Sequence, residues 1–205
     1  MKQVEADHYD FSVYMTLDRW SSIWYQLNEV LKLHPENILE IGHGAGIFQS
    51  VSRGIGLNAS SIDIDGELNP TYVGSVLDLP FSDNSFDVVC CFQVLEHLPY
   101  SNFVDALKEI ARVSKKNVII SLPDAKKAWP CSIQLPRLGA FRWLIHKPYF
   151  KLPKHVWDGQ HYWEINTNGY GIKKILNDIE VAGIRVIKTY RVHEKPYHHF
   201  FVAKV

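Results

Sequence analysis

The sequence predicts an α/β fold, a doubly wound sheet with helices on both faces, and three observations support this prediction. Short apolar runs typical of fully buried strands recur along the chain. Segments with helical periodicity alternate with them, which favours a mostly parallel sheet. The first apolar run ends in a glycine-rich sequence, as expected where a buried strand turns sharply into a helix.

Each element is placed by its own pattern. A helix is predicted over 17–33, because apolar residues recur there at three- and four-residue steps. These residues are expected to form one buried face: Leu17, Trp20, Trp24, Leu27 and Leu31. The other expected elements are buried strands at 37–41, 60–64, 86–92 and 117–122, helices at 102–114 and 167–182, and strands at 184–192 and 197–205. Thr167 or Asn168 is the expected cap of the second of these helices. The result is a Rossmann-like sheet, mostly parallel, closed by a C-terminal antiparallel hairpin strand.

The chain is predicted to be a single domain over residues 1–205, a length that one hydrophobic core supports. An N-terminal helical segment is expected over 1–35. Residues 125–160 break the alternation of strands and helices, because they are rich in proline, aromatic and basic residues without a clean period. We interpret this segment as an inserted lid.

Charge and cysteine content exclude several classes of protein. Lysine plus arginine balances aspartate plus glutamate at 22 each, so no overall field draws the chain to nucleic acid or to a membrane. The first ten residues lack the pattern of a secretory signal, and no run approaches the roughly 20 apolar residues of a membrane span. We expect a soluble, cytoplasmic protein. Cys90, Cys91 and Cys131 lack the spacing of a zinc site and are expected to be reduced packing residues.

The glycine-rich sequence between Glu40 and Gly46 is the sharpest motif. Glycines at the start of a helix let the backbone approach a ligand, and the free N–H groups there suit an anion. The nicotinamide and flavin fingerprint is G-x-G-x-x-G, whereas the spacing here is G-x-G-x-G with an acidic residue two places before the first glycine. This spacing favours a nucleoside cofactor other than a nicotinamide or flavin dinucleotide. No tyrosine-lysine pair or similar set of hydride-transfer residues supports an oxidoreductase.

The chain resembles the class I S-adenosylmethionine-dependent methyltransferases, whose first motif is acidic-x-G-x-G-x-G. Further blocks follow in the order of that family: Ser61-Ile62-Asp63-Ile64-Asp65, Leu79-Pro80-Phe81 with Asn84-Ser85-Phe86-Asp87, and Val94-Leu95-Glu96-His97-Leu98. The resemblance covers roughly residues 36–123. It implies S-adenosylmethionine as methyl donor, S-adenosylhomocysteine as product, and an acceptor that these motifs do not identify. We expect the acceptor to be a small molecule.

The resemblance also implies where the cofactor lies. It places the glycines against the amino-acid part of the cofactor, with Glu40 orienting the loop. Asp63 is expected to accept hydrogen bonds from the ribose hydroxyls, with Asp65 as the competing candidate. The residues expected at the cofactor are Glu40, Gly42, His43, Gly44, Gly46, Asp63, Ile64, Ser75, Val76, Phe92 and Gln93.

Two departures from the family pattern concern the adenine end. The family often has an aspartate four residues before Leu79, and this chain has Ser75 there. A serine hydroxyl accepts the hydrogen bond of the adenine amino group more weakly, with the Val76 backbone or a shifted Asp78 as further candidates. The connection from Asp65 to Tyr72 is also too short for the helix that usually separates these strands.

The N-terminal segment supplies candidates for the opposite end of the cofactor. Tyr9, Tyr14, Arg19 and Trp20 can fold over it, with Arg19 pairing to its carboxylate. The alternative is a surface arginine on a packing helix.

Methyl transfer from a sulfonium depends mainly on positioning, and a base is needed only where the acceptor loses a proton. The candidate bases are His97, His155, His161 and Glu164, and we take His97 and His161 as the catalytic hypothesis. The alternative for each is a hydrogen-bonded packing residue. His161 and Glu164 lack a clear third ligand, so no metal is expected.

The insert is locally basic and aromatic, which bears on the acceptor. Its charged residues are Lys126, Lys127, Arg137, Arg142, Lys147, Lys151 and Lys154 against Asp158 alone, and its aromatic residues include Trp129, Phe141, Trp143, Tyr149, Phe150 and Trp157. Two interpretations stay open: a lid with solvated lysines, or a surface that holds an anionic or lipid-like acceptor. In a variant of the second interpretation, residues 135–152 lie on a membrane surface.

Two other functions were weighed. A non-catalytic partner subunit with the methyltransferase fold is expected to lose the glycine loop or the ribose carboxylate, and this chain keeps both. Nucleic-acid methylation is disfavoured by the neutral charge and by Phe92-Gln93-Val94-Leu95 in place of a proline-tipped catalytic sequence. The oligomeric state does not follow from the sequence.

Overall fold

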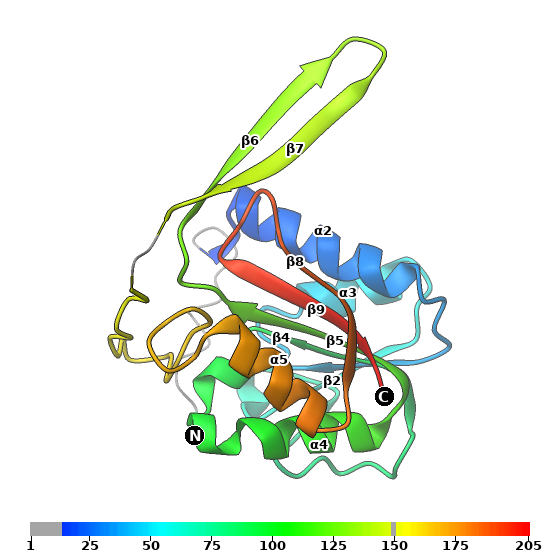
Figure 1. The fold of residues 1–205 in the computed structure, drawn as a ribbon. Helices are drawn as coiled ribbons and strands as arrows, with labels where there is room; N and C mark the ends of the chain where they lie inside the picture. The colour runs from blue at the N-terminus through cyan, green and yellow to red at the C-terminus, as the bar shows by residue number, and fades with distance from the viewer. Residues whose placement is uncertain (1–13, 149–150) are drawn as a thin grey trace.

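The computed structural model describes residues 14–148 and 151–205, and it confirms the predicted fold class. A seven-stranded sheet has the order β3-β2-β1-β4-β5-β9-β8 (Figure 1). Its strands are β1 (Ile38–Ile41), β2 (Ala59–Asp63), β3 (Tyr72–Val73), β4 (Phe86–Phe92), β5 (Ser114–Pro123), β8 (Arg185–Arg191) and β9 (His198–Lys204). Strands β1 to β5 pair in parallel, whereas β9 is antiparallel to both of its neighbours. The predicted C-terminal hairpin is therefore part of the main sheet.

Two hydrophobic cores lie on opposite faces of this sheet. The helices are α2 (Leu17–Leu31), α3 (Ile47–Gly54), α4 (Phe103–Val113) and α5 (Ile172–Val181). Helices α4 and α5 cover one face, where Phe103, Ile175 and Trp163 belong to one buried cluster. Helices α2 and α3 cover the other face, where Val30 and Phe48 belong to a second cluster. This is the doubly wound arrangement that the alternation of elements predicts.

Short helical turns replace a helix between β2 and β3, as the length of that connection predicts. The connection contains only the 3-10 helix η2 (Gly66–Leu68). Two further 3-10 helices, η3 (Leu95–His97) and η4 (Tyr100–Asn102), lead from β4 into α4. Within residues 14–148 and 151–205, no helix combines the length and apolar character that a membrane crossing requires.

Helix α2 buries a different face from the one predicted. Leu17, Trp20 and Trp24 are 82%, 45% and 57% exposed. The buried residues are instead largely polar: Ser22, Gln26, Glu29 and Val30. Polar partners on the C-terminal strands explain this orientation, because Ser22 Oγ lies 2.7 Å from His198 Nδ1 and Lys188 Nζ lies 2.8 Å from Glu29 Oε1.

The last helix begins later than predicted. The Thr167 hydroxyl donates to the Glu164 carbonyl, and Asn166 and Gly169 both have positive φ. Residues 166–171 therefore form turns, and Gly171 rather than Thr167 or Asn168 is the N-cap of α5.

The insert contains a long β-hairpin that the sequence analysis did not predict. Strand β6 (Ala128–Leu135) pairs antiparallel with β7 (Gly139–His146) over eight residues each. These two strands form a separate sheet that projects away from the body of the molecule (Figure 1). Tyr149 and Phe150 lie outside the described residues.

Candidate functional site

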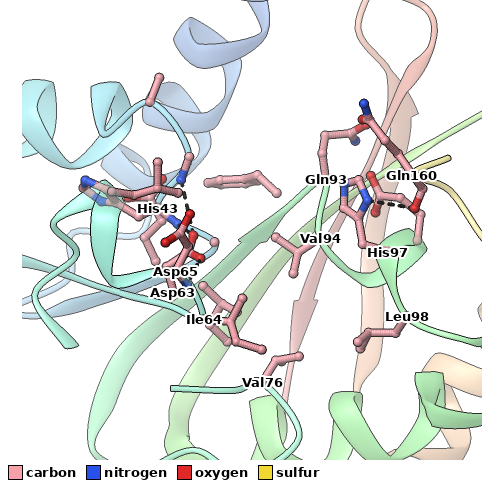
Figure 2. Close-up of a pocket in the computed structure, with 18 of the residues that line it drawn as sticks. His43, Asp63, Ile64, Asp65, Val76, Gln93, Val94, His97, Leu98 and Gln160 are labelled. Carbon is pink, nitrogen blue, oxygen red and sulfur yellow. Dashed lines mark hydrogen bonds between the residues drawn. The ribbon is translucent and has the colours of Figure 1, made fainter. Parts of the chain in front are cut away.

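A cavity of about 920 Å³ lies at the carboxyl ends of β1, β2 and β4. The strand order changes direction between β1 and β4, and open α/β sheets place ligands at such a point. Helix α2, residues 157–162 and the turn before β9 close the cavity on its other sides. The cavity therefore joins the predicted cofactor loop to the end of the insert (Figure 2).

The glycine loop lies along one wall of the cavity. Gly42 has a φ of 84°, and a Cβ atom there would lie 2.2 Å from Cγ2 of Val94. Gly46 has a φ of 67°, and its Cβ would lie 2.7 Å from Nε2 of His43. Only glycine fits these two positions without displacing a neighbour. Helix α3 begins directly after the loop, so its first N–H groups follow this wall.

Asp63 connects the end of β2 to the glycine loop. Its Oδ2 accepts from the backbone N–H of His43 at 2.7 Å, and its Oδ1 accepts from that of Asp65 at 2.9 Å. Each carboxylate oxygen accepts more than one hydrogen bond, so both remain suited to ribose hydroxyls. Asp65 also lines the cavity, and its own side chain accepts from the backbone of Glu67.

Glu40 presents a buried carboxyl group to the cavity. It is 4% exposed, and its Oε2 has no hydrogen-bond partner among the described residues. Burial, together with the nearby charge of Asp63, raises the pKa of this carboxyl well above its usual value. Burying a carboxyl group without a hydrogen-bond partner costs free energy, so the site suits a ligand with a positive charge. His43 beside it does not supply that charge, because burial lowers its pKa.

The adenine end contains the predicted serine. Ser75 and Val76 line the cavity, whereas Asp78 does not. The Ser75 hydroxyl accepts from the backbone N–H of Leu77 at 3.2 Å and retains a donor and a further lone pair. The shifted Asp78 is therefore not placed to take the role of the family's aspartate.

The end of β4 forms the wall between the loop and the rest of the cavity. Phe92 is held by Phe48 of α3 and Phe200 of β9, with ring centroids at 5.3 and 6.0 Å. Gln93 has a φ of 56°, uncommon for a residue other than glycine, and its amide donates to Ser121 Oγ. Backbone strain of this kind is found preferentially at functional sites.

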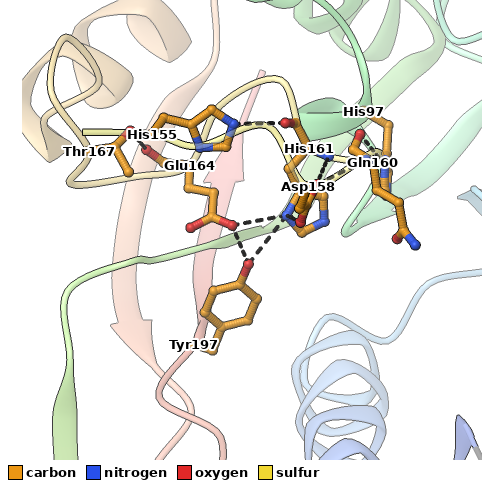
Figure 3. Close-up of polar contacts among 8 residues, drawn as sticks. All are labelled: His97, His155, Asp158, Gln160, His161, Glu164, Thr167 and Tyr197. Atoms are coloured by element: carbon orange, nitrogen blue, oxygen red, sulfur yellow. Dashed lines mark hydrogen bonds and ion pairs between the residues drawn. The ribbon is translucent and has the colours of Figure 1, made fainter. Parts of the chain in front are cut away.

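A cluster of ionisable side chains closes the far end of the cavity (Figure 3). His161 Nδ1 lies 3.0 Å from Glu164 Oε1, which also accepts from the Tyr197 hydroxyl. The rings of His97 and His161 are 5.0 Å apart, and His97 Nδ1 lies 3.1 Å from the Gln160 carbonyl. The backbone N–H of Tyr162 donates to the Glu96 carbonyl at 2.9 Å, which ties the end of the insert to η3.

This cluster perturbs the protonation of its members. Glu96 is completely buried, both its carboxylate oxygens lack partners among the described residues, and burial raises its pKa to about 8. Burial also acts on His161, but its hydrogen bond to the Glu164 carboxylate and the negative charge of Asp158 outweigh it and raise the pKa. The contact with His161 lowers the pKa of Glu164 against the effect of burial. His161 and Glu164 therefore favour an ion pair beside a neutral Glu96.

Two overlapping sets of three side chains bring possible metal ligands within 4.8 Å of one another. They are Glu96, His97 and His161, and Asp158, His161 and Glu164. The third donor that sequence analysis did not find for His161 and Glu164 is thus Asp158. Except for the Glu96 carboxylate, these groups have polar contacts within the protein.

The structure brings nearly all of the predicted site residues into one cavity. Both catalytic candidates line it, as do all the cofactor candidates except Gly46, whose glycine is required by the packing of His43. Arg19 also lines it, with its guanidinium 4.0 Å from the Tyr14 ring centroid, whereas Trp20 does not. Tyr9 lies outside the described residues.

Sequence reasoning missed a group of lining residues contributed by α2 and by the turn before β9. They are Ser22, Gln26, Lys195, Tyr197 and His198. Burial lowers the pKa of His198 to about 3, so this ring is neutral where it contacts Ser22. No local motif marks these residues, because α2 and β9 are neighbours in the fold but lie more than 170 positions apart in the sequence.

Comparisons with known proteins agree with this geometry. Residues 39–122 match the family model of the methyltransferase domain. An uncharacterized protein of Methanocaldococcus jannaschii is 35% identical over 85 residues, which cover 38% of this chain and 36% of that protein. The match thus spans about a third of this curated relative.

Solved methyltransferase structures share the fold over nearly the whole chain. The 1,6-didemethyltoxoflavin-N1-methyltransferase of Burkholderia thailandensis, with bound S-adenosylhomocysteine, superposes with a TM-score of 0.63 at 14% identity, over 97% of this chain and 82% of that one. The magnesium protoporphyrin IX methyltransferase of Synechocystis, with bound SAH, gives a TM-score of 0.62 at 15% identity, over 100% and 89%.

The topology and the position of the glycine loop define the class I methyltransferase fold. Within it, residues 39–122 match the methyltransferase domain model, in agreement with the sequence motifs.

Proposed function

We propose that this protein is an S-adenosylmethionine-dependent methyltransferase that acts on a small acceptor, anionic or lipid-like, bound beside the ionisable cluster. The observation that carries the proposal is the cavity, which places a complete glycine loop and Asp63 at one end and Glu96, His97 and His161 at the other. S-adenosylmethionine supplies an electrophilic methyl group when bound. Each end of the cavity then has a distinct role.

The first end fits the cofactor residue by residue. Gly42 and Gly44 line the part of the cavity that would hold its amino-acid part, and the unpartnered Glu40 carboxyl suits its ammonium group. Arg19, on the opposite wall, is placed to pair with the carboxylate. Asp63 accepts from the ribose, and Ser75 with the Val76 backbone meets the adenine.

The second end holds groups able to move a proton. In its neutral form, the His161 ring accepts a proton from an acceptor hydroxyl or amine, and Glu164 stabilises the resulting imidazolium through Nδ1. The Tyr197 hydroxyl holds Glu164 in place. Lys195, whose ammonium group also contacts Asp18, lines the same cavity and favours an acceptor with negative charge.

The test is production of S-adenosylhomocysteine from labelled cofactor, measured against fractionated anionic and amphiphilic small molecules. The proposal expects product that depends on one fraction. His161→Gln should lower kcat by about 100-fold or more and leave cofactor affinity unchanged. His34→Gln, a histidine outside the cavity, is the matched control. Cofactor binding without turnover on any fraction would contradict the small-molecule acceptor.

The alternative of a non-catalytic partner subunit is not favoured. Such a role does not require the glycine geometry at Gly42 or the open cavity beyond Gln93, and both are present. Turnover of the cofactor by the isolated chain would exclude it.

A further inference from the structure

The hairpin formed by β6 and β7 has two chemically different faces. Residues paired across an antiparallel ladder point to the same side, so the pairs Trp129–Ile145, Cys131–Trp143 and Ile133–Phe141 share one face. Every one of these six residues is apolar. The residues between them lie on the other face: Ala128, Pro130, Ser132, Gln134, Ala140, Arg142, Leu144 and His146. All the polar side chains of the two strands, Ser132, Gln134, Arg142 and His146, lie on this second face, which we call the polar face.

The apolar face is exposed. Trp129, Ile133 and Phe141 are 53%, 50% and 53% exposed, and Trp143 and Ile145 are 43% and 48% exposed. Leu138 in the turn extends this surface and is 71% exposed. A contiguous apolar surface of this kind marks an interaction site, and a two-stranded hairpin is marginally stable in water without one.

The polar face is the one turned toward the body of the protein. Arg142 Nη1 lies 2.8 Å from Glu194 Oε1, and His146 lies 3.5 Å from Arg191. Both partners belong to the strand β8 and the turn that follows it. Because the two faces are opposite, the apolar face is directed away from the body.

The charge of the hairpin indicates whether a second copy of the chain or a lipid surface covers its apolar face. Between Ala125 and Lys147 the sequence contains five basic residues and no acidic one: Lys126, Lys127, Arg137, Arg142 and Lys147, of which Arg142 pairs with Glu194 on the face toward the body. A second copy packed on this face would bring two such sets of cations together, which is unfavourable. A surface of anionic phospholipid would complement them and would bury the aromatic side chains at its interface.

We propose that the apolar face of the β6–β7 hairpin docks on an anionic membrane, with Trp129, Phe141 and Trp143 in the interfacial region and Arg137 at the headgroups. The segment that returns from the hairpin, residues 157–162, lines the cavity. The proposal does not depend on methyl transfer, because binding is measured without cofactor or acceptor.

The test is co-sedimentation of the full-length protein with vesicles of phosphatidylcholine, with and without phosphatidylglycerol. Binding is expected only with phosphatidylglycerol and should weaken with added salt. Ile133→Ser combined with Phe141→Ser should reduce it at least tenfold. Ile187→Ser is the matched control, because Ile187 lies on β8 and is also 50% exposed. Arg137→Glu changes the charge by two and should reduce binding about 30-fold.

A second measurement keeps the outcome unambiguous. Lipids brominated on their acyl chains should quench tryptophan fluorescence in the wild type and less in Trp143→Phe. No co-sedimentation with anionic vesicles, or equal binding by the double variant and the control, would overturn the proposal. Self-association that the double variant abolishes, without vesicle binding, would assign the face to a second copy instead.

Discussion

Replacing Glu96 by glutamine should change how stability depends on pH. The folded protein holds this carboxyl at a pKa of about 8 against an ordinary value of 4.5. The folded state therefore binds one more proton than the unfolded state between these two pH values. A group with a raised pKa stabilises fully below pH 4.5, and that contribution is lost as the pH rises toward 8. At pH 7 the loss is roughly 3 kcal/mol.

Glutamine keeps the shape of the side chain and does not titrate. We therefore expect Glu96→Gln to gain roughly 3 kcal/mol of unfolding free energy relative to wild type when the pH rises from 4.5 to 7. The measurement is urea unfolding at a series of pH values. The difference in unfolding free energy between the variant and the wild type is compared across pH, so any pH-independent cost of burying the amide cancels. Glu67→Gln, an exposed carboxyl, is the control. Parallel pH profiles for wild type and Glu96→Gln would refute the assigned burial and protonation.

Three further predictions follow from the packing and the cavity. Trp163→Ala removes a completely buried indole that donates to the Leu98 carbonyl, so thermal or urea unfolding should show a loss of about 3 to 5 kcal/mol. A loss below about 1 kcal/mol would contradict the packing. Gly42→Ala introduces a Cβ atom against the stiff Val94 side chain at positive φ, and should cost about 2 to 4 kcal/mol by the same assay, whereas Gly56→Ala, with open space around it, should cost less. Ser75→Asp should tighten cofactor binding by about tenfold in calorimetry through a stronger acceptor for the adenine amino group, and unchanged affinity would place the adenine elsewhere.

The succession of strands and helices along the chain was predictable because it depends on local patterns. The buried runs at β1 and β4 are nearly continuous in apolar residues, and such strands are covered on both faces. The glycine loop was found by its spacing, and Asp63 by its place in the family motif. Their common place at one edge of the sheet follows from parallel pairing of β1 and β2.

The orientation of α2 was not predictable from its own sequence. Its apolar stripe indicated burial of Trp20 and Trp24, but the buried face carries Ser22 and Glu29. The partners of these polar residues, His198 and Lys188, lie more than 150 positions away. A helical period shows that one face differs from the other, but the tertiary contacts determine which face is covered.

The hairpin could have been found from its alternation. Apolar residues occupy every second position of 129–135 and of 141–145, a period of two that is typical of strands. Pro130 obscured the first run, because proline is excluded from central strands but is tolerated at an edge. The ionisable cluster could not have been assembled from sequence, since Glu96, His161 and Tyr197 come from three separate segments.

Calorimetric titration with S-adenosylhomocysteine tests the central claim most directly. The wild type should bind one equivalent, and Asp63→Ala should bind at least tenfold more weakly while Asp65→Ala is affected less. Equal affinity for all three would place the nucleoside outside this site. Absence of binding by the folded wild type would contradict the assignment of the cavity to this cofactor.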